Sequence, residues 1–206
     1  MPHENPGPET TFGFLSTFDS PEHGYFGGYL IVSLLGRPVE FHCTSPVRPS
    51  RAQEILYGPT LQPYLFGEQI GGALLQAAKL SPRLILTDQA AILTVRPQAS
   101  VPMALVLGRV DTGAAPTLDE AGGATGVASS LVDATRLHSF DGQFAAGNYH
   151  LQLATGYEME QHTVVELVTQ LRQHVDVAEP FGRIHEAIRE AQRIGGRTSE
   201  AHGQAA

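Results

Sequence analysis

The chain has 206 residues, a formal net charge of -8 and a pI near 5.5, with 42% hydrophobic and 17% charged residues. This composition indicates a folded globule and excludes a disordered acidic tail. The 13 Lys and Arg residues are outnumbered by 21 Asp and Glu residues, so the long-range field repels a polyphosphate backbone. We therefore expect no nucleic-acid partner.

Cysteine content and the length of the apolar runs bear on the compartment. The single cysteine, Cys43, excludes an intramolecular disulfide and a metal site built on cysteine. Residues 1–11 lack the basic and apolar regions of a signal peptide. The strongly apolar runs, such as 29–35, are far shorter than the ~20 residues of a membrane helix. A cytoplasmic protein that does not span a bilayer is expected.

The first fifty residues predict strands after a disordered tail at 1–11. The runs 11–18 and 26–35 are rich in β-forming residues and are separated by turn residues. Gly27 and Gly28 are interpreted as turn glycines. In residues 38–47 apolar and polar residues alternate, which predicts a further strand and a hairpin.

Helices are predicted next. Residues 50–57 form a short helix, with Ser50 as N-cap and Gln53 three residues later in a capping-box pattern. A longer helix is predicted from Thr60 to about Leu80. Its apolar residues lie nearly all round the helix axis, so it is expected to be buried.

The middle of the chain predicts strands at 83–88 and 101–110, joined by a weak turn or helix, and therefore a parallel pair. Residues 111–130 are rich in Gly and Ala and are expected to form a flexible insertion. A second hairpin is predicted from residues 135–140 and 148–154.

The last third predicts two amphipathic helices. One carries an apolar stripe that includes Val164, Leu167 and Leu171. The other opens at Pro180 and is expected to end at Gly195, before a disordered tail at 196–206. The fold class is thus α+β, a single domain over 12–195 with a mixed sheet, hairpins and helices packed mainly on one face.

The segment 37–69 combines groups that can act as acid, base or ligand with residues suited to burial. His42 and Glu40 share one face of the predicted strand. On a helical wheel Glu68 falls among Leu61, Tyr64 and Leu65, where a carboxylate is rare unless it is paired or functional. The candidate ligand-binding residues are Glu40, His42, Arg48, Arg51, Tyr57 and Glu68, which we expect to meet at one spot.

Several roles are open for these residues. Glu68 is either an ion-pair partner of Arg48 or Arg51, or a general base with a raised pKa. His42 and Glu68 are the catalytic candidates, and the two arginines are able to hold a small anion. Cys43 is not expected to act as a nucleophile activated by His42, because neighbours on a strand point to opposite faces; it is expected to be buried.

Signatures of common enzymes and cofactor sites are absent from the sequence, including a phosphate loop, GxSxG, HExxH and CxxC. No cofactor and no metal is therefore expected. A metal site would need His138 and His150 to face each other across the second hairpin with Asp141 nearby, whereas solvent-facing histidines are the ordinary alternative.

Two functions fit these observations. The first is a non-enzymatic module that binds a partner protein or a small ligand through the segment 37–69, with a homodimer as one form of partner. The alternative is a cofactor-independent enzyme that acts on a small polar or anionic substrate with Glu68 or His42 as its base.

Overall fold

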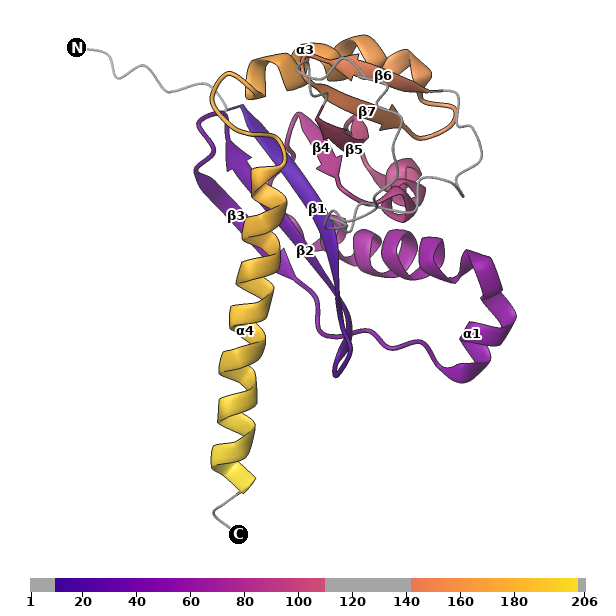
Figure 1. Ribbon diagram of the computed structural model, residues 1–206, viewed down its shortest axis with the longest axis vertical. Coiled ribbons are helices and arrows are strands. Elements are labelled where there is room, and N and C mark those ends of the chain that lie inside the picture. The colour runs from indigo at the N-terminus through magenta and orange to yellow at the C-terminus, as the bar shows by residue number, and fades with distance from the viewer. Residues whose placement is uncertain (1–9, 110–141, 204–206) are drawn as a thin grey trace, which may run out of the picture.

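The computed structural model describes residues 10–109 and 142–203, and its centre is a mixed seven-stranded sheet in the order β3-β2-β1-β4-β5-β7-β6 (Figure 1). Strand β1 pairs antiparallel with β2 and parallel with β4, and β4 pairs parallel with β5. The other neighbours are antiparallel. The strands are β1 (Thr11–Ser20), β2 (Gly24–Ser33), β3 (Pro38–Cys43), β4 (Leu84–Thr87), β5 (Met103–Arg109), β6 (Gln143–Ala146) and β7 (Tyr149–Leu153).

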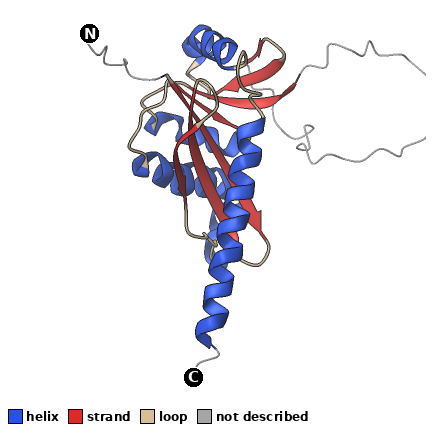
Figure 2. Ribbon diagram, turned by 90° about the vertical axis from the view of Figure 1, so that its left-hand side faces the viewer, coloured by secondary structure: helices blue, strands red, loops and turns tan. Residues whose placement is uncertain are grey.

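Helices cover both faces of this sheet, as Figure 2 shows. One face carries two α-helices near the C-terminus, and the other carries shorter helical segments from the middle of the chain. The first group is α3 (Gln161–Leu171) and α4 (Glu179–Gly203); the second is η2 (Pro63–Gly71), α2 (Gly72–Ala77) and η3 (Ala90–Gln98). Three short segments, α1 (Arg51–Tyr57), η1 (Gly58–Thr60) and η4 (Glu158–Glu160), contribute no residue to the core.

The alternation of β1 divides the core between the two faces. Phe12 and Phe14 point toward α4, and the Phe14 ring meets the Phe181 ring edge to face with centroids 5.4 Å apart. Leu15 points to the other side, where it joins Ile70 and Leu74 beneath η2 and α2. The sheet is therefore the middle layer of three.

Adjacent glycines in β2 let helices approach from both sides. A Cβ atom on Gly27 would collide with the Cγ2 of Ile70 and lie 2.8 Å from the Cδ1 of Leu74. A Cβ atom on Gly28 would collide with Ile184 of α4 on the opposite face. Since successive residues of a strand face opposite ways, the pair opens one space per face.

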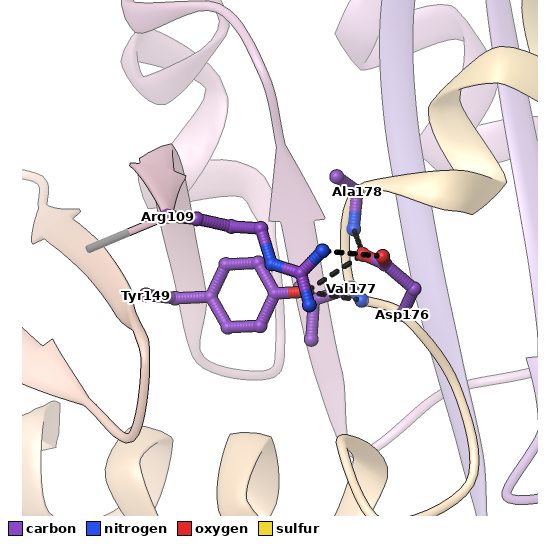
Figure 3. Close-up of polar contacts among 5 residues, drawn as sticks. All are labelled: Arg109, Tyr149, Asp176, Val177 and Ala178. Atoms are coloured by element: carbon purple, nitrogen blue, oxygen red, sulfur yellow. Dashed lines mark hydrogen bonds and ion pairs between the residues drawn. The ribbon is translucent and has the colours of Figure 1, made fainter. Parts of the chain in front are cut away.

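The link between α3 and α4 is held to the sheet by a polar cluster (Figure 3). The Tyr149 hydroxyl donates to Asp176 Oδ1 at 2.6 Å and accepts from the Val177 N–H at 3.2 Å. Asp176 also accepts from the Ala178 N–H and from Arg109. These bonds lower the pKa of Asp176, the one from Tyr149 most. They satisfy the backbone of the link, so it fixes where α4 begins.

Much of the predicted secondary structure is confirmed. The α+β class, the mixed sheet, the hairpins and the two C-terminal amphipathic helices are present. Ser50 accepts from the Gln53 N–H, and the Gln53 side chain accepts from the Ser50 N–H, so the capping box is complete. The crossover from β4 to β5 through η3 gives the predicted parallel pair.

Three expectations differ from the structure. Helices lie on both faces instead of mainly on one, because β1, β2, β4 and β5 carry apolar residues on both sides. Gly27 and Gly28 lie inside β2, where close packing and not a turn requires them. The helix expected over 60–80 is divided into η2 and α2 and ends at Ala77.

The remaining boundaries also shift. The first strand of the second hairpin is Gln143–Ala146, which lies in the expected turn. Helix α4 continues past Gly195 to Gly203, because glycine weakens a helix without ending it unless it takes a left-handed cap. The expected insertion at 111–130, the strand at 135–140 and most of the tail at 1–11 lie outside the described residues.

The close approach at Gly28 predicts a specific loss of stability. We expect Gly28→Ala to lower the free energy of unfolding by about 1–3 kcal/mol, since the new methyl overpacks against Ile184. The measurement is chemical denaturation of the full chain. Gly182→Ala in α4 is the matched control, because nothing lies within 4 Å of its Cβ position; it should be neutral or stabilising by up to about 1 kcal/mol. Equal effects of the two changes would contradict the packing described.

Candidate functional site

Glu40 and His42 form a closed polar group on β3. The His42 Nε2 lies 2.5 Å from Glu40 Oε1, and Glu40 also accepts from the Lys79 and Leu80 N–H groups at 2.7 and 2.9 Å. The hydrogen bond with His42 is the main reason that the pKa of Glu40 lies below its ordinary value. Glu40 thus ties the end of α2 to β3, and its acceptor oxygens are already occupied.

A shallow groove of about 200 Å³ lies beside this group, before the starts of β4 and β5. Tyr29, Lys79, Gln98 and Ser100 contribute polar groups to its wall. Clefts that bind small molecules usually have about 300–1,000 Å³. The groove is smaller than that range, and the Glu40 and His42 groups are engaged with each other.

The two arginines of the predicted set do not join Glu40 and His42. The Arg48 Nε donates to the His23 carbonyl at 2.9 Å, near the turn between β1 and β2. Arg51 pairs with Glu54 one helical turn away at 2.8 Å, on the surface of α1. Their positions favour local structural roles, and the expected anion clamp is not assembled here.

Glu68 is exposed, so the expectation of a buried carboxylate was wrong. The reason is the geometry of η2, a π-helix with hydrogen bonds from residue i to i+5. Leu65 and Ile70, five residues apart, are the side chains that it buries. A wheel drawn at 3.6 residues per turn separates Leu65 from Ile70 and groups Glu68 with Leu61 and Tyr64, which the structure leaves only partly buried.

Tyr57 lies near Glu68 instead. Its ring stacks on the Tyr64 ring with centroids 4.3 Å apart. The pKa of Tyr57 is raised, first by a hydrogen bond with Tyr64 and also by the charge of Glu68. Figure 1 shows α1 and β3 on opposite sides of the molecule. The candidate residues therefore occupy separate places and do not meet at one spot.

Helix α1 presents apolar side chains to solvent. All of its residues are exposed or partly exposed, and Ile55 and Leu56 keep 66% and 81% of their surface. A helix of this length is unstable in isolation. Here it is held by the Ser50 cap and by the Tyr57–Tyr64 stack, so its apolar side chains are free for another contact.

Among the strands of residues 10–109 and 142–203, β3 is the outermost on its side of the sheet (Figure 1). It exposes Val39, Phe41 and Cys43, with 46% and 39% of the first two accessible. Phe41 and Cys43 lie on the face shared with α4, whereas the pairing with β2 shifts register at Val39. Cys43 is thus exposed and not buried as expected, since α4 packs over β1 and β2 and stops short of the edge. An open edge with apolar side chains is a template for strand pairing.

A second polar cluster, which the sequence analysis missed, lies beyond the paired ends of β1 and β4. The buried Ser16 hydroxyl donates to Asp88 Oδ2 at 3.0 Å and lies 2.9 Å from His185 Nε2 on α4. Burial raises the pKa of Asp88, and its Oδ1 is buried without a partner among the described residues. The carboxyl ends of parallel strands commonly carry functional groups.

The spatial order of the Ser16, Asp88 and His185 side chains decides which chemistry this cluster can perform. A nucleophilic triad places the histidine between the serine and the acid. Here Ser16 lies in the middle and donates a hydrogen bond to Asp88, so the acid is not placed behind His185 to orient it as in a triad. One signal was visible in the sequence: Ser16 interrupts the inward row of Phe12, Phe14 and Phe18.

Neither possible metal ligands nor comparisons with known families change the assignment of the Ser16, Asp88 and His185 cluster. Within residues 10–109 and 142–203 no three His, Cys, Asp or Glu side chains are placed to share a metal ion. His150 is exposed, while His138 and Asp141 lie outside the described residues.

None of the helices in the described ranges combines the length and apolarity needed to cross a membrane. No protein-family model matches the sequence, and no similar sequence is found among curated proteins.

The raised pKa of Asp88 makes stability depend on pH in a defined direction. Folding favours the neutral form of Asp88. The contribution of this carboxyl to the free energy of unfolding is therefore complete below the unfolded pKa of about 3.9 and is lost as pH rises through the folded pKa. Asp88→Asn keeps an acceptor for Ser16 and does not titrate. We expect it to become more stable relative to the native chain as pH rises from acid to neutral.

Asp176→Asn is the control of opposite sign, because the pKa of Asp176 is lowered. It should be less stable than the native chain at neutral pH, and the difference should shrink in acid. The measurement is the free energy of unfolding against pH for the three chains. If Asp88→Asn instead loses stability relative to the native chain as pH rises, Asp88 is ionised and paired with His185.

Proposed function

We propose that the protein is a non-enzymatic protein-binding module that uses the segment 37–69, with β3 as its docking strand. The observation that carries this proposal is the open outer edge of β3 with exposed Val39, Phe41 and Cys43. A strand added to such an edge gains main-chain hydrogen bonds, and alternate side chains give the choice of partner.

A protein partner is supported over a small ligand by the local geometry. The Glu40 and His42 side chains bond to each other and to the backbone after α2. The neighbouring groove is smaller than ordinary ligand clefts. The apolar surface of α1 provides a second contact area at some distance from β3, as an extended partner would use.

We also place the module in the cytoplasm. Cys43 is an exposed free thiol on the proposed docking strand. Such a thiol persists where glutathione and thioredoxin keep cysteines reduced, whereas in an oxidising compartment it is a site of unwanted cross-linking.

Acid–base catalysis is the second candidate function, and one observation favours it. Asp88 is a buried acid with a raised pKa next to Ser16 and His185. A neutral carboxylic acid at this position is able to donate a proton to a polar substrate. This candidate replaces Glu68 and His42 as the acting groups. It predicts that Asp88→Asn abolishes an activity without unfolding the protein.

The binding proposal is tested by charging the docking strand. Phe41→Lys places a solvated cation on the edge, which blocks strand addition at little cost to the fold because Phe41 is already exposed. Met159→Lys is the matched control, since Met159 is 95% exposed and lies in η4.

The binding measurement uses purified components. Interacting chains, copies of this protein included, are isolated from the native cell and their affinity is measured against each variant. We expect binding to be at least tenfold weaker with Phe41→Lys and unchanged with Met159→Lys. Equal binding of all forms would overturn the proposal, as would the absence of any interacting chain.

A further inference from the structure

We propose that the groove before the starts of β4 and β5 binds a short-chain monocarboxylate, with Lys79 and Tyr29 holding the carboxylate group. The groove lies between α2 and η3, on the opposite face of the sheet from α4. This role therefore goes beyond the docking function of β3. Three features support it, namely the charge of the lining, the placement of one buried phenol and the size of the groove.

The charge of the groove comes from an unusual residue. Lys79 is the only lysine among the 206 residues of the chain, and it lines the groove. Among the described residues of the wall, Lys79 alone carries a charge. None of the ion pairs within residues 10–109 and 142–203 includes it. Its ammonium group, a compact donor of hydrogen bonds, is thus available to an anion.

The backbone that carries Lys79 is fixed by the polar group on β3. The Lys79 and Leu80 N–H groups donate to the two Glu40 oxygens at 2.7 and 2.9 Å, and His42 bonds to the same carboxylate. These three donors compensate the negative charge of Glu40 within the fold. The wall of the groove is therefore held in place before a ligand arrives, which lowers the entropy cost of binding.

Tyr29 brings a hydroxyl from β2 to the groove. It lies opposite Leu15 in β1, and its ring crosses that strand diagonally at Gly13, where a Cβ atom would lie 2.6 Å from the hydroxyl oxygen. Gly13 is paired with Ile85 of β4, and Ile85 and Tyr29 both line the groove. The absence of a side chain at Gly13 thus lets the phenol reach this position.

The Tyr29 hydroxyl is a buried donor that the described part of the chain leaves without a hydrogen bond. Only 1% of the residue is exposed, and a buried tyrosine hydroxyl usually finds a partner. Burial, and then the charge of Glu40, raise the pKa of Tyr29. The phenol therefore stays protonated at physiological pH, so it can donate to a carboxylate and does not repel it.

The size and the walls of the groove define the rest of the ligand. The volume is about 200 Å³. A water takes up ~30 Å³ in the liquid, so a molecule of about six non-hydrogen atoms fits. Leu75, Pro82 and Val101 supply apolar wall beside the hydroxyls of Ser81 and Ser100. A carboxylate with a short apolar tail matches this lining.

A single cation favours a monocarboxylate over phosphate. Phosphate carries more charge at neutral pH, and arginine forks are the side chains that bind it with the best geometry. No arginine is among the described residues that line the groove. One ammonium group with neutral hydroxyl donors balances one carboxylate charge.

The test begins with calorimetry of the natural full-length chain. Butyrate is the test ligand, 1-butanol has the same tail without the charge, and inorganic phosphate is an anion without the tail. We expect saturable binding of butyrate at one site. Binding of 1-butanol and of phosphate should be at least about tenfold weaker, because each lacks one of the two sets of contacts.

Two substitutions separate the carboxylate contacts from folding. Lys79→Met removes the charge and Tyr29→Phe removes only the hydroxyl, and each should weaken butyrate binding at least about tenfold. Arg51→Met and Tyr64→Phe are the matched controls outside the groove and should bind butyrate normally. Without butyrate, the two groove variants should melt with the natural chain, because neither removed group bonds within the described fold.

The single lysine also provides a direct reporter. Reductive methylation with ¹³C-formaldehyde labels Lys79 and the α-amino group, and it keeps both positive charges. In NMR spectra of the labelled full-length chain, butyrate should shift the Lys79 methyl signal and leave the α-amino signal in place. Phe41→Lys should not alter this titration, since Phe41 does not line the groove.

Several results would overturn the carboxylate site. They are a lack of saturable butyrate binding, equal affinity for 1-butanol or phosphate, an unshifted Lys79 signal, and binding that survives both Lys79→Met and Tyr29→Phe. Loss of partner binding in Phe41→Lys with butyrate binding intact supports both roles. If Phe41→Lys leaves partner binding intact while butyrate still binds through Lys79 and Tyr29, the docking function fails and the carboxylate site holds.

Discussion

The architecture depends on the close approach of helices to both faces of β2 at Gly27 and Gly28. A side chain at Gly27 would displace Ile70 of η2, and one at Gly28 would displace Ile184 of α4. Interiors are packed too closely to absorb such additions without strain. The two glycines therefore allow one sheet to be the middle of three layers. The Tyr149–Asp176 cluster then fixes the start of the helix that covers one face (Figure 3).

Because helices cover both faces of the sheet, the edges decide which of its backbone groups are accessible to another molecule. The faces of β1, β2 and β4 are closed by helices, and within the described parts of the chain unpaired backbone groups remain at the sheet edges. At β3 that edge combines outward N–H and C=O groups with exposed apolar side chains. The polar pair of Glu40 and His42 is meanwhile used within the fold. This division is the physical basis for proposing a binding function at the edge of β3, with catalysis at Asp88 as the second candidate.

Local patterns in the sequence predicted what local forces determine. The Ser50 capping box, the strand alternation from Glu40 to Cys43 and the parallel crossover before β5 follow from propensity and periodicity, and each is present. Glu68 was misplaced because a π-helix changes the residue spacing that defines a face. The Ser16, Asp88 and His185 cluster joins residues 72 and 169 positions apart, and no short-range pattern encodes such a contact. The candidate residues of the segment 37–69 failed to converge for the same reason.

Amide hydrogen exchange along β3, followed residue by residue at low and high protein concentration, tests the central claim most directly. The account predicts that the His42 amide, which bonds within the sheet, is protected at both concentrations. The Phe41 and Cys43 amides should exchange rapidly in dilute solution and become protected as the strand finds its partner. Rapid exchange of Phe41 and Cys43 at every concentration, in the presence of an authentic partner as well, would contradict a docking role for this edge.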